Sequence, residues 1–341
     1  MRAHFFVTAV ALTTFSVHVL ANNNTSIVLQ TGMGNMAMTD QSDFSTQDST
    51  ILQVQNGTNN FSGATQFGTT LNSTINHTQI GSAHSSLDLE QENATSSSIT
   101  ILQSGNGHLL ADFQIDTIGT TLLQTQIGTN NGVSGTQIRS TNDQATLLQQ
   151  GDSNLSSQTQ IDSENNIINI TQNGNTNSAP SIQIESSLGT ILIDQTGDQN
   201  ESGISHNLST SDFASSTQFG TANMISLGQG GGSNNLATVD QVGEQNSIQA
   251  NQFSTSFTQL IVDQQRMLNT QIIFQTGSLI SSLTIQSGME NSVVSNQNGM
   301  NQTLTSLQNG TLNSLTANQS GASQLANVTR LGTSNRGTIN Q

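Results

Sequence analysis

Short stretches of the chain alternate apolar and polar residues with a period of two, and each stretch leads to a glutamine. Ile168 and Ile170 share their parity with Gln172, whereas the residues between them are Asn and Thr. Residues of one parity lie on one face of a β-strand. The pattern predicts short strands that turn their apolar residues and the glutamine inward.

A second strand is expected after each of these, following a turn. Asn177, Ala179, Ser181 and Gln183 share one parity, so we expect them to face the first strand. Between the two strands the sequence reads Gln-x-Gly-x-x-Asn, and both Gly and Asn tolerate the positive φ of a turn. Each half-unit is therefore predicted to be one short strand and one turn.

Glutamine recurs at a fixed spacing. Seven successive intervals of equal length separate Gln103 from Gln264, and a second series lies between them with His206 in one position. The period is about 23 residues, and after Gln264 the step between successive glutamines tightens to a uniform value of about 11 residues. Looser steps continue the series upstream, from Gln30 to Gln91. We expect these side chains to stack as ladders formed by Gln103, Gln114, Gln126, Gln137, Gln149, Gln160, Gln172, Gln183, Gln195, Gln218, Gln229, Gln241, Gln252, Gln264, Gln275, Gln286, Gln297, Gln308, Gln319 and Gln341.

Glycine follows two residues after the glutamine in many units, and eleven units contain the complete Gln-x-Gly-x-x-Asn motif. The turn glycines expected from this arrangement are Gly105, Gly128, Gly151, Gly174, Gly197, Gly220, Gly243, Gly288 and Gly310.

An 11-residue hydrophobic repeat is also typical of a right-handed helical supercoil, which is the main structural alternative. Each unit, however, contains Gly and Asn, and the remaining residues are largely Ile, Val, Thr and Ser, which favour strands. We therefore predict an all-β fold: a β-solenoid, or cross-β stack, of strand-turn-strand rungs with about 22 to 23 residues each. About 28 half-repeats make some 14 rungs, about 65 Å tall at ~4.8 Å per rung.

The composition explains what kind of core such a stack contains. About half of the residues are Asn, Gln, Ser or Thr, and Trp, Tyr, Cys and Lys are absent. Amide side chains stacked rung on rung satisfy one another, so a polar core is tolerated in this architecture. The absence of Cys excludes disulfides, and five Arg against 21 acidic residues disfavour nucleic-acid binding.

The N-terminal residues have the features of a secretion signal. Arg2 precedes an apolar run that ends at Val19-Leu20-Ala21, so we interpret residues 1 to 21 as a signal peptide. A membrane anchor is the alternative, but the run is short and interrupted by polar residues. We expect an exported chain whose mature part does not insert into the membrane.

The repeat resembles that of the curlin family. The likeness is plainest in Gln172-Asn-Gly-Asn-Thr-Asn177-Ser-Ala179, which is followed by Gln183 eleven residues after the first glutamine. It extends over nearly all of the chain after the signal peptide, and its specificity comes from the number and phase of the copies. Three features depart from the family: Tyr and Trp are missing, the serine six residues before the glutamine is present mainly at Ser49 and Ser97, and the chain holds more repeats than familiar members.

The resemblance implies a subunit of curli, the extracellular amyloid fibres of bacterial biofilms. Such a subunit passes through an outer-membrane secretion pore with the help of chaperones, and it polymerises at the cell surface on a nucleator subunit. The family also places a short secretion-targeting segment before the first repeat, which here is residues 22 to 29. The repeat domain is then residues 30 to 341.

Four charged residues occupy the glycine position of alternate turns: Asp116, Arg139, Asp162 and Glu185. One interpretation is that they act as gatekeepers, slowing self-association before export is complete. The other is that they are solvated turn residues, since turns readily accept charges.

No catalytic or metal site is expected. His77, His84, His108 and His206 fall in different rungs and different positions, so we interpret them as separate surface residues rather than metal ligands. The glycine and aspartate spacing lacks the nonapeptide of calcium-binding β-rolls. We expect no enzymatic activity and no cofactor.

These observations favour a structural subunit that forms fibres by templated β-strand addition, supporting biofilm matrix, adhesion and aggregation. Gln341 falls in mid-pattern, so we expect the last rung to be open to the first rung of another molecule. The alternatives are a monomeric β-solenoid adhesin or surface-binding protein, including the ice-binding kind, a polysaccharide-active β-helix enzyme, and prion-like disorder.

Overall fold

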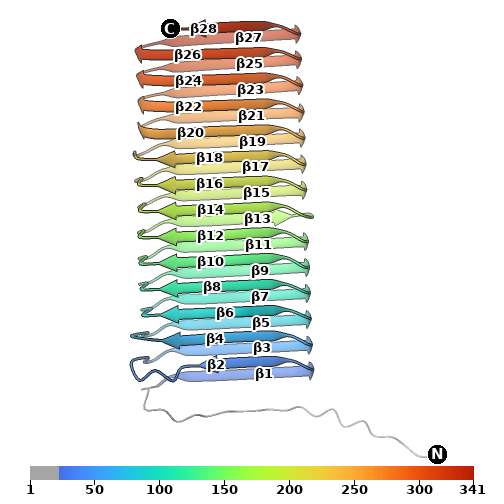
Figure 1. Cartoon of the computed structure of the whole chain (residues 1–341), viewed down its shortest axis with the longest axis vertical. Coiled ribbons are helices and arrows are strands. Elements are labelled where there is room, and N and C mark those ends of the chain that lie inside the picture. Colours follow the sequence, from blue (N-terminus) through green and yellow to red (C-terminus); the bar gives the residue numbers. More distant parts are fainter. Residues whose placement is uncertain (1–22) are drawn as a thin grey trace, which may run out of the picture.

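A computed structural model describes residues 23–341, in which 28 β-strands and no helix are present. The chain winds into a straight stack of 14 rungs, each made of one odd-numbered and one even-numbered strand (Figure 1). The predicted all-β solenoid with strand-turn-strand rungs is therefore confirmed. The signal peptide expected at residues 1 to 21 lies outside the described residues.

The odd-numbered strands form one 14-stranded sheet, called sheet A below, and the even-numbered strands form a second, sheet B. Sheet A contains β1 (Thr25–Met33), β3 (Thr50–Thr58), β5 (Thr74–Ser82), β7 (Ser98–Asn106), β9 (Thr121–Thr129), β11 (Gln144–Asp152), β13 (Ile167–Asn173), β15 (Thr190–Asp198), β17 (Phe213–Thr221), β19 (Leu236–Glu244), β21 (Gln259–Met267), β23 (Ser281–Met289), β25 (Thr303–Thr311) and β27 (Leu325–Thr333). Sheet B contains β2 (Met36–Asp40), β4 (Phe61–Phe67), β6 (Ser85–Glu92), β8 (Leu109–Ile115), β10 (Gly132–Ile138), β12 (Leu155–Ile161), β14 (Ser178–Ile184), β16 (Glu201–Asn207), β18 (Met224–Gly230), β20 (Ser247–Ser256), β22 (Thr270–Ser278), β24 (Ser292–Met300), β26 (Ser314–Ala322) and β28 (Arg336–Asn340).

All pairs of neighbouring strands are parallel and aligned on the repeat. Gln172 of β13, for example, lies opposite Gln149 of β11 and Gln195 of β15. The stack begins at Thr25, before the expected boundary at residue 30, so residues 25 to 29 of the candidate targeting segment are part of the first strand.

The core lies between the two sheets and contains the residues whose parity predicted it. Ile168 and Ile170 of β13 are fully buried, as is Ala179 of β14 on the opposite sheet. One apolar cluster runs through the stack from Ile51 to Ile273. Buried polar side chains accompany it in every interior rung, so the core is a mixture of aliphatic and amide groups, as the composition predicted.

The repeat becomes shorter at Gln264, where the separation of successive ladder glutamines changes from 23 positions to 22. The cause lies in the half-repeats of the even strands, where the turn loses three residues and the strand gains two. Residues 116 to 120 follow the 7 residues of β8, whereas only residues 279 and 280 follow the 9 residues of β22. The transition falls at β20, whose pairing with β22 shifts register between Gln252 and Thr255. The looser spacing near the N-terminus is due in part to a bulge in β6.

Candidate functional site

The glutamines of sheet A form a continuous hydrogen-bonded ladder along the stack. Twelve successive Nε2-to-Oε1 bonds link Gln30 to Gln308 at distances of 2.6 to 3.1 Å. From Gln55 onward these side chains are buried. Each amide donates to the rung that follows it and accepts from the rung before, so the ladder has one direction along the axis.

The same amides also join the two sheets. Besides donating along the ladder, Gln172 Nε2 donates to the carbonyl oxygen of Leu155 in sheet B at 3.1 Å. Gln195 and Gln218 make the equivalent bonds to Ser178 and Glu201. Both amide hydrogens are thereby used, which removes the cost of burying the group without partners.

Sheet B carries a second ladder that is broken once. Six bonds link Gln41 to Gln183, and five more link Gln229 to Gln341. His206 lies in register between Gln183 and Gln229, and neither of its ring nitrogens has a hydrogen-bond partner. In sheet A, Arg330 takes the ladder position after Gln308.

The turn glycines form a column whose conformation and spacing strongly favour glycine. All nine predicted turn glycines have φ between 110° and 130°, a region that residues with a Cβ avoid. A Cβ on Gly174 would lie 2.0 Å from the carbonyl oxygen of Gly197 in the next rung. The column contains one exception among the described residues, Arg266, which has φ 79° at the rung where the repeat shortens.

The asparagine that closes the motif has the predicted conformation only in the Gln229 unit, where Asn234 has φ 55°. We expected it to supply positive φ, but in the Gln172 unit Thr176 takes that conformation, with φ 58°, and Asn177 is buried. Asn177 Oδ1 accepts from the backbone N–H of Asn200 at 2.9 Å, and its Nδ2 donates to the carbonyl of Gly197 at 2.7 Å. The asparagine side chain thus completes the hydrogen bonds of backbone groups in the neighbouring turn.

The interpretation of the four histidines as surface residues is wrong. All four side chains are buried, and His84 stacks on His108 with 5.0 Å between ring centroids. These two rings replace asparagine in the column described above. His84 Nδ1 accepts from the His108 N–H at 3.3 Å, and its Nε2 lies 3.1 Å from the Ile80 carbonyl. The imidazole therefore supplies one acceptor and one donor in the places where asparagine supplies Oδ1 and Nδ2.

This arrangement makes the histidine pair sensitive to acid. Nδ1 must remain unprotonated to accept, and burial lowers the pKa of both His84 and His108. Because their folded pKa is below the unfolded value, their contribution to stability is present above about pH 6.5 and is lost as the pH falls. We expect the unfolding midpoint in urea to fall more between pH 7 and pH 5 in the wild type than in the His84→Asn, His108→Asn double variant.

Asparagine is the residue at neighbouring positions of this column, so the double variant keeps both hydrogen bonds and removes only the titration. His77 and His206, whose burial lowers their pKa to about 4, are unchanged in both proteins. Burial raises the pKa of Asp112 to about 7, and its effect runs the other way, since protonation is favoured in the folded state. Equal pH dependence of the two proteins would refute this role of the pair.

Asp112 is a core residue that the sequence reasoning missed. It faces inward from β8, and one carboxylate oxygen accepts from Gln124 Nε2 at 2.9 Å. Gly135 lies beside it in β10, where a Cβ would come within 2.5 Å of the carboxylate. Its parity with Gln114 signals that it faces inward, but the pairing with Gln124 across the sheets requires the structure.

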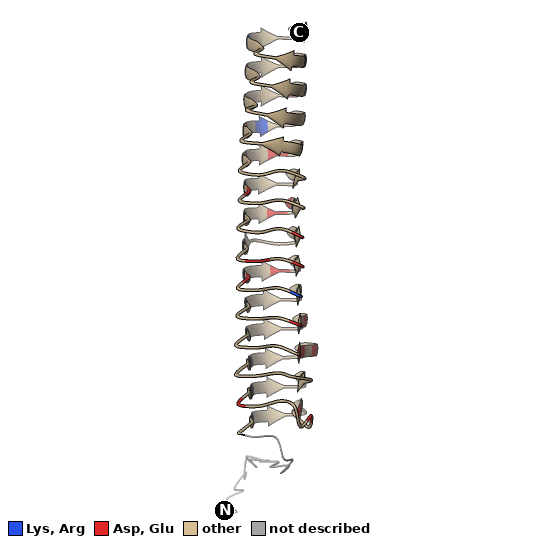
Figure 2. Cartoon of the chain, turned by 90° about the vertical axis from the view of Figure 1, so that its left-hand side faces the viewer, with Lys and Arg blue, Asp and Glu red and all other residues tan. Residues whose placement is uncertain are grey.

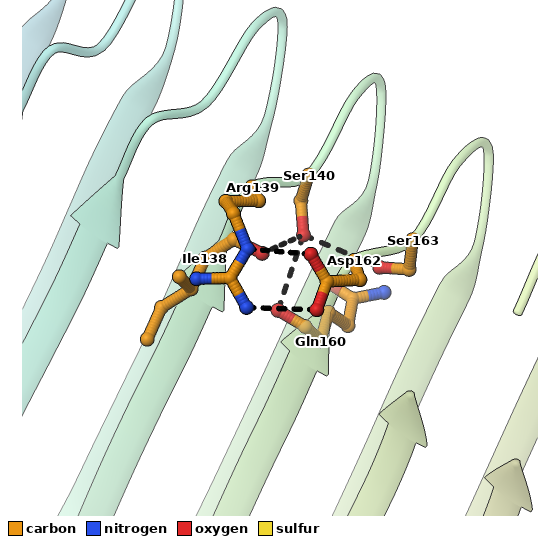
Figure 3. Close-up of polar contacts among 6 residues, drawn as sticks. All are labelled: Ile138, Arg139, Ser140, Gln160, Asp162 and Ser163. Atoms are coloured by element: carbon orange, nitrogen blue, oxygen red, sulfur yellow. Dashed lines mark hydrogen bonds and ion pairs between the residues drawn. The ribbon is translucent and has the colours of Figure 1, made fainter. Parts of the chain in front are cut away.

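The four charged turn residues lie at one corner of the stack in successive rungs. Each has φ between 48° and 54°, so they take the left-handed conformation without being glycine. Arg139 Nε and Nη2 donate to the two carboxylate oxygens of Asp162 at 2.5 and 2.7 Å (Figure 3). These hydrogen bonds lower the pKa of Asp162 and raise that of Arg139. Both side chains are exposed, so the pair contributes little to stability.

Within residues 23–341, no group of three or more His, Cys, Asp or Glu residues is placed to hold a metal ion. The same residues include no helix long and apolar enough to cross a membrane. No protein-family model and no curated protein matches the chain. The candidate functional site is therefore defined by geometry alone: two amide ladders and a glycine-asparagine column that repeat along one axis.

Proposed function

We propose that the protein is a structural subunit of extracellular amyloid fibres, which grow along the solenoid axis by adding β-strands of one molecule to those of another. The observation that carries this proposal is the repetition of the axial interface. Every interior rung offers the next rung the same groups: two strand edges, a glutamine side chain, and a turn that completes the hydrogen bonds of the neighbouring turn. A surface that binds its own copy inside the chain is suited to bind it between chains.

The outer edges of the described stack support the proposal. β1 and β27 are the edge strands of sheet A, and β2 and β28 are those of sheet B. Gln30 begins the ladder of sheet A at one edge, and Gln341 ends the ladder of sheet B at the other, where Arg330 takes the ladder position of sheet A. Backbone and amide groups at such edges pair readily with another strand of the same register.

The resemblance of the repeat to curlin supports a matching cellular role. On this proposal the chain is secreted, leaves through an outer-membrane pore with the help of chaperones, and polymerises at the cell surface on a nucleator. The fibres would serve biofilm cohesion and adhesion. The carboxylates and histidines described above lie in corners, ladders and the core. The proposal assigns the protein no enzymatic activity and no cofactor.

Seeded growth tests this function. Protein purified without denaturant is incubated with and without sonicated fibres, and thioflavin fluorescence and fibre length are followed over days. We expect seeds to lengthen and to remove the lag phase. Fibre diffraction should also give a meridional reflection at about 4.8 Å. Because a single solenoid has the same strand spacing, elongation of the seeds is the decisive readout. A protein that stays monomeric and thioflavin-negative would refute the proposal and favour a monomeric adhesin or other surface-binding protein.

The gatekeeper hypothesis for the charged corner is tested on the same assay. Replacing Asp116, Arg139, Asp162 and Glu185 with Gly removes the charges and relaxes the left-handed backbone. We expect a shorter lag phase than in the wild type. A variant with Asn at all four positions separates the causes, because Asn removes the charge but keeps a side chain that tolerates this conformation. Unchanged lag times in both variants would show that these residues are only solvated corners.

A further inference from the structure

The middle of the outward face of sheet A carries no charged residue over its first seven strands, from β1 to β13. In each strand, the four outward positions from five residues before the ladder glutamine to one residue after it hold only Thr, Ser, Asn, Gln or aliphatic residues. The one charged outward residue of these strands, Asp152, is the last residue of β11. Ile80, Leu123, Ile127 and Ile167 are each 39 to 44% exposed on this surface. We call these four outward positions of β1 to β13 the neutral face.

The neutral face is unusual in a chain with a formal charge of −16. Figure 2, an edge-on view, shows charged residues at many levels of the stack, including the rungs that carry the neutral face. At the positions of the neutral face, charged residues of sheet A first occur in β15. Asp194 of β15, Asp240 of β19 and Asp263 of β21 each directly precede the ladder glutamine. The outward face of sheet B is divided into shorter uncharged runs by acidic residues in β2, β6 and β16.

We propose that the neutral face binds the neutral face of a second copy of this chain, side by side. Two negatively charged molecules repel, so lateral contact is favoured where neither contributes a charge. The block measures about 30 Å along the axis by about 25 Å along the strands, so a pair buries about 1,500 Å² in total, the size of a stable protein interface. This pairing is perpendicular to fibre growth and does not depend on the proposed function.

The side chains of the neutral face suit interdigitation between flat sheets. Ile80 and Ile127 stand in one column with Ser104 between them in the intervening strand. The smaller serine on the intervening strand leaves space between the two isoleucines for a side chain from the facing sheet. Asp194, Asp240 and Asp263 then limit the contact, since a copy shifted along the axis would bring carboxylates into an uncharged interface.

A pair of matched variants tests this interface. Thr125→Asp with Thr171→Asp places two carboxylates on the neutral face, whereas Thr136→Asp with Thr159→Asp places two on sheet B. All four threonines are partly exposed and directly precede a ladder glutamine. Asp194, Asp240 and Asp263 show that the fold accepts aspartate at this position in sheet A, and Asp40 shows the same for sheet B.

The readout is mass per unit length of unstained fibres in scanning transmission electron microscopy, or molar mass by light scattering where the protein forms no fibres. We expect the wild type and the sheet B variant to have twice the mass of a single solenoid, and the neutral-face variant to have half of that. Seeded elongation is measured on the same samples and should be unchanged, which separates lateral pairing from axial growth. Single-solenoid mass in the wild type, or loss of pairing in the sheet B variant alone, would overturn the proposal.

Discussion

Replacing Gly174 with alanine is expected to destabilise the solenoid by about 3 kcal/mol, because the substitution conflicts with both the conformation and the space at this turn. Gly174 has φ 124°, and its Cβ would lie 2.0 Å from the carbonyl oxygen of Gly197. That oxygen belongs to the backbone of the next rung, so no side chain can rotate away to relieve the contact. We expect a lower midpoint in urea denaturation followed by circular dichroism.

The matched control is Gly203→Ala in the adjacent rung. Gly203 lies in β16 with an ordinary backbone conformation, and the nearest atom to a new Cβ is a side-chain carbon of Pro180 at 3.7 Å. Alanine should leave the midpoint there nearly unchanged. Arg266 shows how a side chain is accommodated in the glycine column, by a φ of 79° at the rung where the repeat changes. Equal midpoints for the two alanine variants would disprove the steric role of the column.

The fold could be predicted because two periods can be recognised in the sequence: the alternation of inward and outward residues along each strand, and the spacing of the glutamines. Parity places Ile168, Ile170 and Gln172 on one face, and the regular spacing brings each glutamine opposite the next. Both relations can be recognised without knowing the conformation of the turns. The same reasoning did not locate the histidines, although the sequence contains the signal. His84 and His108 stand five residues after Gln79 and Gln103, at the motif position that asparagine takes in other units. Considered as isolated residues, they do not show this shared column.

The turns were predicted less well for a physical reason. Left-handed backbone was assigned to Gly and Asn, yet Thr176, Leu188 and Gln199 adopt it as well. In a stack the conformation of one turn is imposed by hydrogen bonds to the turns above and below, as when the Gln199 N–H donates to the Asn175 carbonyl at 2.9 Å. Local preference is therefore overruled by the neighbouring rungs at most of these corners.

The neutral face was missed for a related reason. Charge was counted over the whole chain, and an excess of acidic residues says nothing about which surface carries them. Only the assignment of each residue to an inward, outward or turn position shows that Asp152, at the end of β11, and Asp162 and Glu164, between β12 and β13, lie outside the neutral face. Composition therefore describes the core of this protein well and its outer surfaces poorly.

Replacing Gln149 with leucine is expected to cost about 2 to 5 kcal/mol, because a single side chain completes three buried hydrogen bonds. Gln149 Oε1 accepts from Gln126 at 3.1 Å, and its Nε2 donates to Gln172 at 2.8 Å and to the Gly132 carbonyl in sheet B at 3.2 Å. Leucine fills a similar volume but leaves these buried partners without a bond. The urea midpoint measures the loss, and seeded fibre growth should slow in parallel if the ladder continues between molecules.

The adjacent residue provides the control for this variant, since Gln150 differs from Gln149 only in the side of the strand that it occupies. Gln149 is fully buried, whereas Gln150 is exposed on the outward face of β11. Gln150→Leu removes the same amide from the same strand and should change the stability by less than about 0.5 kcal/mol. If both leucine variants unfold at the same urea concentration, the glutamine ladder does not stabilise the stack, and the buried amides would be tolerated rather than required.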